Sequence, residues 1–304
     1  MADLATTRTA VRGSVATYAA TFTDEDTGDI VDPGATTITL TSASGSVVQA
    51  ATPMAAESDD TLSFALTTTH TQNLDKLTAT LTTANLGTYS ATLDIVGRHL
   101  FSIAEARSYH DNALADTDKF TTSAIMEARD RITEEFEQIA GVSFVPRYEY
   151  VTQNSALLDS SRLLLYKSNG DPALRVTSIR SVDARTIGTS TWAAFTVDEL
   201  AGLYVTDAGL LVRETGGHWL YGYDNTRIGF EHGYVTPPLP IKTAALKLAR
   251  YLVVPSNANS RALTETTTFG TVQLATAGRY GDHYGIPDVD SVLDRYTDRV
   301  PVVR

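Results

Sequence analysis

The stretch from Gly141 to Arg147 separates two kinds of hydrophobic periodicity, and this change most limits how the chain can fold. Before it, from about 122 to 140, apolar residues recur every three or four positions, as in an amphipathic helix. After it, apolar and polar residues alternate in short runs, as in strands. Gly141 is placed to end the helix in a left-handed conformation, and Pro146 prevents the helix from continuing. With Phe144 as an apolar anchor, we interpret Gly141, Phe144 and Pro146 as a scaffold elbow.

Residues 14–96 show the two-residue period of strands, with threonine at many of the polar positions. Clusters of Gly, Pro, Asn and Asp separate the runs, and no helical periodicity interrupts them. About seven short strands in such a segment are typical of an immunoglobulin-like β-sandwich. The chain contains no cysteine, so the antibody-type disulfide is absent and only the architecture is predicted.

Charge and composition place a domain boundary near Gly97. Residues 1–97 hold three basic and eleven acidic side chains, whereas the remaining residues hold 21 basic and 25 acidic ones. We therefore predict an α+β protein of two domains, with the sandwich at 1–97 and a second domain at 98–304.

The second domain is predicted as a small helical bundle with a β-rich insertion at 147–235. Its helices are expected at about 102–110, 122–140, 240–254 and 287–298. The first follows a capping box, Ser102-Ile103-Ala104-Glu105, and the third begins at Pro240. Strands of the insertion are expected at Tyr148–Thr152, Arg162–Tyr166, Leu174–Val182, Ala194–Val197, Leu203–Val205, Leu210–Val212 and Arg227–Glu231.

Residues 256–286 are rich in Thr, Gly and Asn and are predicted to form an extended arm. The helix after this arm carries Val289, Leu293 and Tyr296 on one face. We expect this stripe to dock on a neighbouring chain, because an isolated short helix has no surface of its own on which to bury it. The alternative is that the helix folds back onto its own bundle.

The sequence offers no constellation of residues for catalysis. The absence of cysteine excludes thiol nucleophiles and thiolate zinc sites, and the six histidines lack metal-ligand spacing. No Walker A sequence or GxSxG elbow occurs. We predict that the chain is not an enzyme and has no cofactor and no metal site.

Three further clusters are interpreted as structural. The acidic run Asp24-Glu25-Asp26 is a solvated turn, and Asp288-Val289-Asp290 supplies negative charge to a helix N-terminus. The aromatic-rich turn Gly216-Gly217-His218-Trp219, with Tyr221 and Tyr223, is interpreted as strand-edge packing rather than a sugar-binding surface.

The bulk properties limit the partners. No apolar run approaches the ~20 residues of a membrane-spanning helix, and no signal-peptide pattern is present, so neither membrane insertion nor secretion is expected. The net charge of −12 argues against general binding of duplex DNA.

Several segments in order resemble one protein family. They are Asp94–Gly97, Leu100–Arg107, Glu134–Glu137, Gly141–Arg147, Ile228–Tyr234 with Pro238 and Pro240, and Gly285–Tyr296. Together they are similar to the head-to-tail adaptor (connector) proteins of long-tailed bacteriophages, especially those that infect actinobacteria. The resemblance covers roughly residues 94–304, and the N-terminal sandwich resembles an appended domain found in some of these adaptors.

The resemblance implies a structural virion protein that assembles as a dodecameric ring under the portal protein. Its C-terminal segment would dock on the portal, and its opposite side would receive the next neck or tail protein. Genomic DNA would pass through the lumen without sequence-specific binding. The protein would be assembled in the host cytoplasm and located in the virion neck. On this chain the docking positions would be Val289, Val292, Leu293, Tyr296 and Val300.

Two other readings stay open. The immunoglobulin-like part could make the chain a virion-surface or extracellular binding module that recognises a sugar or a host surface. Within the neck, a head-closure protein or a tail terminator is the nearest alternative ring. A hydrolase would need an acid–base pair that spacing alone does not provide.

Overall fold

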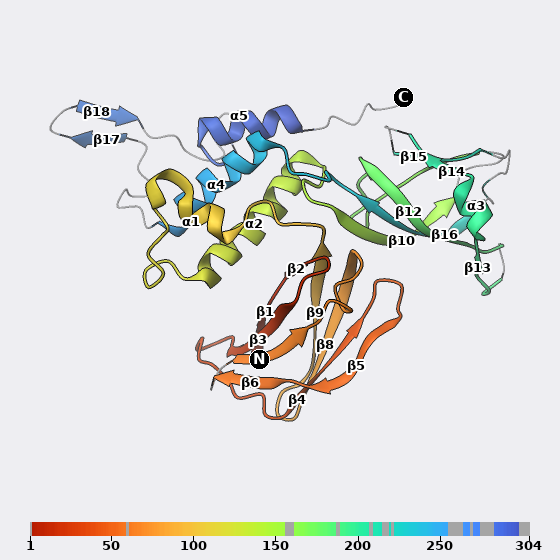
Figure 1. The fold of residues 1–304 in the computed structure, drawn as a ribbon, viewed down its shortest axis with the longest axis horizontal. Helices are drawn as coiled ribbons and strands as arrows, with labels where there is room; N and C mark the ends of the chain where they lie inside the picture. The colour runs from red at the N-terminus through yellow and green to blue at the C-terminus, as the bar shows by residue number, and fades with distance from the viewer. Residues whose placement is uncertain are drawn as a thin grey trace. The chain divides into compact units, whose positions relative to one another are not determined.

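The computed structural model describes residues 2–58, 61–155, 161–186, 189–206, 209–214, 219, 222–254, 264–267, 270–273 and 283–297. Within these ranges the protein is a mixed α+β structure with five helices and strands in several sheets (Figure 1). The chain divides into two compact units. Unit 1 comprises Met1–Arg98 and Val145–Val235, and unit 2 comprises His99–Phe144 and Thr236–Arg304.

The first 96 residues of unit 1 form two sheets. One has the strand order β1-β3-β7-β6, and the other has the order β2-β9-β8-β4-β5, in which β2 runs parallel to β9. The inward-facing side chains of both sheets are buried in one shared apolar core. The strands are β1 (Ala2–Thr6), β2 (Thr9–Val11), β3 (Ala16–Asp24), β4 (Thr36–Thr41), β5 (Val47–Pro53), β6 (Ala55–Ser58), β7 (Thr61–Leu66), β8 (Asp75–Thr83) and β9 (Gly87–Val96).

The second β part of unit 1 also contains two sheets. One has the order β10-β16-β12-β13 and the other β11-β15-β14, and all their pairings are antiparallel. The strands are β10 (Arg147–Ser155), β11 (Arg162–Leu164), β12 (Val176–Ala184), β13 (Ala193–Ala194), β14 (Leu203–Val205), β15 (Leu210–Arg213) and β16 (Gly222–His232).

The predicted strand Ala194–Val197 is wrong at its C-terminal end. Val197 does not close a strand but begins α3 (Val197–Ala201). The cause is a capping box, in which the Thr196 hydroxyl accepts from the Glu199 amide at 3.3 Å and the Glu199 carboxylate accepts from the Thr196 amide at 2.8 Å. The box satisfies two amides that a helix start leaves unpaired.

Charged side chains attach the second β part to β8 and β9. Arg147 pairs with Asp94 at 2.7 Å, and Lys76 pairs with Glu149 at 3.5 Å. Arg180 donates to the carbonyl oxygen of Leu74 at 2.5 Å. Residues 145–235 therefore pack with the N-terminal sheets, which differs from the expected grouping of 147–235 with the helices.

Unit 2 is built from helices of two separate chain segments. They are α1 (Ile103–Asn112), α2 (Thr122–Ala140), α4 (Leu239–Val253) and α5 (Pro287–Tyr296). α4 packs on α1, α2 and α5, and α5 also contacts α2. The α2 face toward this core carries four buried residues of the expected stripe, namely Ile125, Ala128, Ile132 and Phe136. The fifth expected residue, Ile139, is half-buried, and Ala140 is buried beside it.

The segment expected to be an extended arm contains regular structure. Thr264–Thr267 (β17) and Gly270–Gln273 (β18) form an antiparallel hairpin. The other residues of the predicted arm, up to 282, lie outside the described part of the chain. The four helices of unit 2 occupy nearly the ranges that the sequence predicts.

Candidate functional site

The elbow after α2 has the geometry that its sequence suggests. Gly141 has φ 72° and ψ 0°, and its amide donates to the Glu137 carbonyl at 3.0 Å. Phe144 is fully buried, and its ring meets Tyr296 of α5 edge-on with centroids 6.0 Å apart. The Phe144 amide donates to the Glu137 side chain at 2.9 Å. The elbow therefore joins the end of α2 to α5.

Pro146 makes a close contact that sequence reasoning missed. The Gly97 amide donates to the Pro146 carbonyl at 2.9 Å, and a Cβ on Gly97 would lie only 2.6 Å from Pro146 Cγ. Position 97 must therefore be glycine for the backbone to approach the proline ring. Two short sequence signals, a glycine and a proline 49 positions apart, form one structural contact within unit 1.

α1 is held to the connection that follows it by Arg107. Its guanidinium donates to the carbonyl oxygens of Leu114 at 2.9 Å and Phe120 at 3.2 Å, and to the Thr122 hydroxyl at 3.1 Å. The Lys242 ammonium hydrogen-bonds Glu105, which holds the pKa of that carboxyl below its usual range. The expected capping box of Ser102 and Glu105 is present.

The end of α1 is strained. Three consecutive non-glycine residues, His110, Asp111 and Asn112, have φ values of 50°, 57° and 60°. Right-handed helical geometry is already lost at Tyr109, where ψ is 137°. Each left-handed non-glycine residue costs on the order of 1 kcal/mol or more.

The α5 stripe folds back on its own unit, so the expectation that it could not be buried there is wrong. Val289 and Leu293 are fully buried, because α5 packs against α2 and α4. Just before the helix, the Tyr284 hydroxyl donates to Glu135 of α2 at 2.8 Å, and the Tyr284 amide donates to Asp290 at 2.9 Å.

The remaining docking positions divide into two groups. Val292 and Tyr296 are half-buried and present part of their surface to solvent. Val300 lies outside the described residues. Docking of this helix on a portal stays a prediction, carried by the exposed parts of Val292 and Tyr296.

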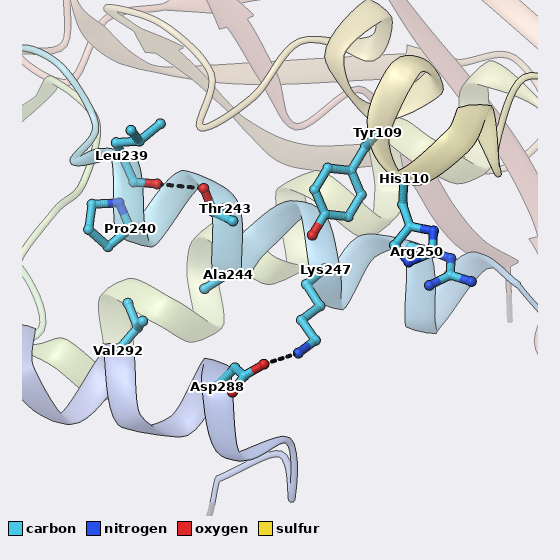
Figure 2. A pocket seen from close by; sticks show the side chains of 10 residues that line it. All are labelled: Tyr109, His110, Leu239, Pro240, Thr243, Ala244, Lys247, Arg250, Asp288 and Val292. Carbon is cyan, nitrogen blue, oxygen red and sulfur yellow. Dashed lines mark hydrogen bonds and ion pairs between the residues drawn. The ribbon is translucent and has the colours of Figure 1, made fainter.

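A groove of about 590 Å³ lies between α1, α4 and α5 (Figure 2). Leu239 and Pro240 of α4 line one end of it, and Tyr109 of α1 and Val292 of α5 also border it. Leu239 is 73% exposed and adds apolar area at this end of the groove.

The polar groups of this groove are mainly basic. His110, Lys247 and Arg250 line it together with one carboxylate, Asp288. Lys247 and Asp288 form an ion pair, drawn as a dashed line in Figure 2. The Arg250 Nε atom is buried and has no hydrogen-bond partner among the described atoms. The groove thus offers apolar contact area beside the Arg250 guanidinium and the Lys247–Asp288 ion pair.

The residues singled out for possible chemistry are placed as follows. Trp219 is buried, stacks on Phe195 with ring centroids 6.0 Å apart, and donates to the Ser161 carbonyl at 3.2 Å. Tyr223 is 77% exposed. Residues 216–218 and 221 lie outside the described ranges. In the Asp24 turn, hydrogen bonds from the amides of Asp26 and Thr27 lower the pKa of the Asp24 carboxyl.

Two histidines are kept neutral by burial. Burial, with Arg129 nearby, lowers the pKa of His99 to about 3. Burial, with Lys167, Arg147 and Lys76 nearby, lowers the pKa of His232 to about 3. Among the described residues, no group of three or more His, Asp or Glu side chains could hold a metal ion. None of the helices in the described ranges is long and apolar enough to cross a membrane.

No protein-family model, curated protein or solved structure matches this chain.

Proposed function

We propose that this chain is a structural subunit of a bacteriophage neck, a head-to-tail adaptor that forms a ring under the portal. The observation that carries the proposal is the order of elements. Two helices, α1 and α2, are followed by a β-rich segment, and α4 and α5 then complete the same helical unit. A helical bundle with a β insertion is the architecture that the resemblance of residues 94–304 implies.

The N-terminal part is an immunoglobulin-like domain in this proposal. Labelling its strands in immunoglobulin fashion, β1-β3-β7-β6 corresponds to the order A-B-E-D, and β9-β8-β4-β5 to G-F-C-C′. The parallel strand β2 then lies beside the last strand, β9. This order supports a domain that is appended to the adaptor and decorates the ring.

The partners follow from the position of such a ring. The portal binds one side, a downstream neck or tail protein binds the other, and twelve copies of the chain surround the channel. Genomic DNA slides through a lumen that is acidic enough to repel phosphates, in keeping with the net charge of −12. A predominantly basic channel wall in an assembled neck would contradict the acidic lumen.

The test of the function is portal binding by variants that keep the unit 2 core. Removing α5 altogether would expose the partners of Val289 and Leu293, which are fully buried. The half-buried positions are better targets, so the variant is Val292→Asp with Tyr296→Ala. We expect it to lose portal capture in a pull-down while its circular dichroism stays unchanged.

A matched control is Ser291→Asp, which adds the same charge at an exposed position of the same helix. An electron micrograph of the assembled neck tests the proposal as a whole. Density for this chain anywhere except in a ring that touches the portal would overturn it.

A further inference from the structure

We propose that Asn169 is a site of spontaneous deamidation, and that the turn formed by residues 167–171 controls the reaction. Among all asparagines of the chain, only Asn169 is followed by glycine. Glycine has no Cβ, so the backbone nitrogen after Asn169 can approach the asparagine side chain more freely than in any other pair. The reaction turns a neutral amide into a carboxylate, and each modified copy gains one negative charge.

The reaction needs no partner except water. The Gly170 nitrogen attacks Cγ of Asn169 and forms a cyclic succinimide, while the Cγ–Nδ2 bond breaks. Nδ2 leaves as ammonia and takes the proton of the Gly170 amide. Water then opens the ring. Cleavage of the bond between Cγ and the Gly170 nitrogen gives aspartate, and cleavage of the backbone C–N bond gives isoaspartate. One water is consumed, one ammonia is released, and nothing is oxidised or reduced.

The turn is open to water on the side of the reacting groups. Asn169, Gly170 and Asp171 are all exposed. Gly170 has φ 86°, and apart from its neighbours in the chain no described atom lies within 4 Å of the position that a Cβ would take. Solvent therefore reaches both the attacking residue and the leaving amide.

Hydrogen bonds hold the same groups in place while the turn is closed. The Gly170 amide donates to the Lys167 carbonyl at 2.9 Å, so the nitrogen keeps its proton while this bond is intact. Asp171 fixes the Asn169 side chain twice. Nδ2 donates to the Asp171 carboxylate at 2.7 Å, and Oδ1 accepts from the Asp171 amide at 3.1 Å. The reaction therefore starts from the opened turn, and exposed loops open at little cost in free energy.

The product cannot close the turn in the same way. Where Asn169 Nδ2 now donates to Asp171, two carboxylates would face each other and repel. Isoaspartate also adds a methylene to the backbone between Lys167 and Asp171, whose amide and carbonyl groups bond at 2.7 Å. Deamidation thus makes the opening of this turn irreversible.

Peptide mapping of the full chain after incubation in mildly alkaline buffer tests the site. Tryptic cleavage isolates Asn169 in the peptide Ser168–Arg175, and the exposed Asn85 in the peptide Leu77–Arg98 is the internal reference. We expect the mass change of NH to O in Ser168–Arg175 in at least tenfold higher yield than in the reference peptide, with part of it as isoaspartate. A sample digested without incubation gives the background.

The variant Asp171→Ala tests the control by the turn. It removes the acceptor of Asn169 Nδ2 and leaves the Asn169–Gly170 pair unchanged. Deamidation should become up to about tenfold faster, because a hydrogen bond to a charged group holds the closed turn. The matched control is Asp118→Ala, which removes an exposed carboxylate elsewhere and should leave the rate unchanged. Circular dichroism checks that both variants are folded.

A third variant, Asn169→Gln, should lose the modified peptide, since the longer side chain closes a ring far more slowly. A yield in Ser168–Arg175 no higher than in the Asn85 peptide would overturn the site. Equal rates in wild type and Asp171→Ala would overturn the control by the turn.

Discussion

The two β parts of unit 1 bury their cores with different chemistry. Residues 2–96 enclose almost purely apolar side chains, among them Tyr18, Phe22 and Leu81, with threonines on the outer faces. Residues 147–232 also bury apolar side chains, but their core lies beside a set of arginine–aromatic stacks. These are Arg175 on Tyr234 at 4.0 Å, Arg180 on Tyr148 at 4.6 Å, Arg185 and Arg227 on Trp192 at 4.7 and 3.9 Å, and Arg213 on Phe195 at 4.9 Å.

The buried polar side chains also differ between the two β parts. The first part buries four hydroxyl residues, Thr36, Ser63, Thr71 and Thr83, whereas the second buries Glu149 and His232, which can change charge. The core of the first part follows from the alternation of apolar residues along each strand. The core of the second part also depends on charged and aromatic side chains that meet from distant strands. The first part should therefore be sensitive to lost volume, and the second to pH and to lost charge.

The largest expected effect is the loss of volume in the first part. Phe22 is 1% exposed, and its ring meets Tyr89 edge-on with centroids 5.2 Å apart. Phe22→Ala should lower the free energy of unfolding by about 3–5 kcal/mol in urea titrations. Val15→Ala, at a position 72% exposed, is the control and should change it by less than about 0.5 kcal/mol. A cost below about 1 kcal/mol at Phe22 would contradict the core assignment.

The second effect is pH dependence in the second part. The pKa of His232 is lowered to about 3 by burial, whereas the unfolded imidazole titrates near 6.5. Below pH 6.5 the unfolded chain binds a proton that the folded chain does not. Stability should therefore fall by up to about 1.4 kcal/mol per pH unit as the pH is lowered from 6.5 to 5, and should not change from this cause above 6.5.

Tryptophan fluorescence isolates this effect, because both tryptophans, Trp192 and Trp219, belong to the second β part. The measurement is the urea midpoint of the fluorescence transition at pH 5 and pH 7. His232→Gln should flatten the pH dependence even if it lowers stability at both pH values. An equal pH slope in the variant would assign the dependence to other groups.

The same contrast explains which parts of the fold could be predicted from sequence. The α2 helix and the strand periodicity of residues 14–96 were predicted correctly, because both patterns are local. The short strands β1 and β2 were not predicted, since they lie before residue 14, where the strand periodicity begins. Val197 was wrongly predicted to end a strand, because its β-branched side chain is typical of strands. The capping box of Thr196 and Glu199 instead starts a helix at this residue.

The candidate site was less predictable for a different reason. The α5 stripe was visible in the sequence, but its burial against α2 and α4 depends on where the helix packs, which periodicity does not encode. The groove joins residues as distant as Lys247 and Asp288, and one wall ends in the left-handed residues from His110 to Asn112. His, Asp and Asn are the non-glycine residues that adopt positive φ most often, so this segment carries a local signal that the sequence prediction did not use.

A third prediction concerns the attachment of the second β part to the first. Gly97→Ala would place a Cβ 2.6 Å from Pro146 Cγ and should cost about 1–3 kcal/mol, because the proline ring and its backbone must move. The control is Gly202→Ala, where φ is −82°, a backbone angle that alanine adopts readily. Thermal unfolding of both variants tests the claim, and equal stabilities would show that the contact relaxes freely.

The smallest effect is the coupling within single surface pairs, and it compares the two parts most directly. The Arg227 guanidinium lies 3.9 Å from the centre of the Trp192 ring, whereas the cross-strand pair Thr39–Thr80 joins β4 to β8 without charge. Double-mutant cycles with Arg227→Met and Trp192→Leu, and with alanine at both threonines, measure each coupling by urea unfolding. We expect about 1 kcal/mol for the arginine–tryptophan pair, since a cation over an indole gains electrostatic attraction beyond contact area. The threonine pair should couple by only about 0.2 kcal/mol, at the low end for cross-strand neighbours. Equal couplings would mean that the stacks add packing area alone, and the difference between the two β parts would then be one of buried polar groups only.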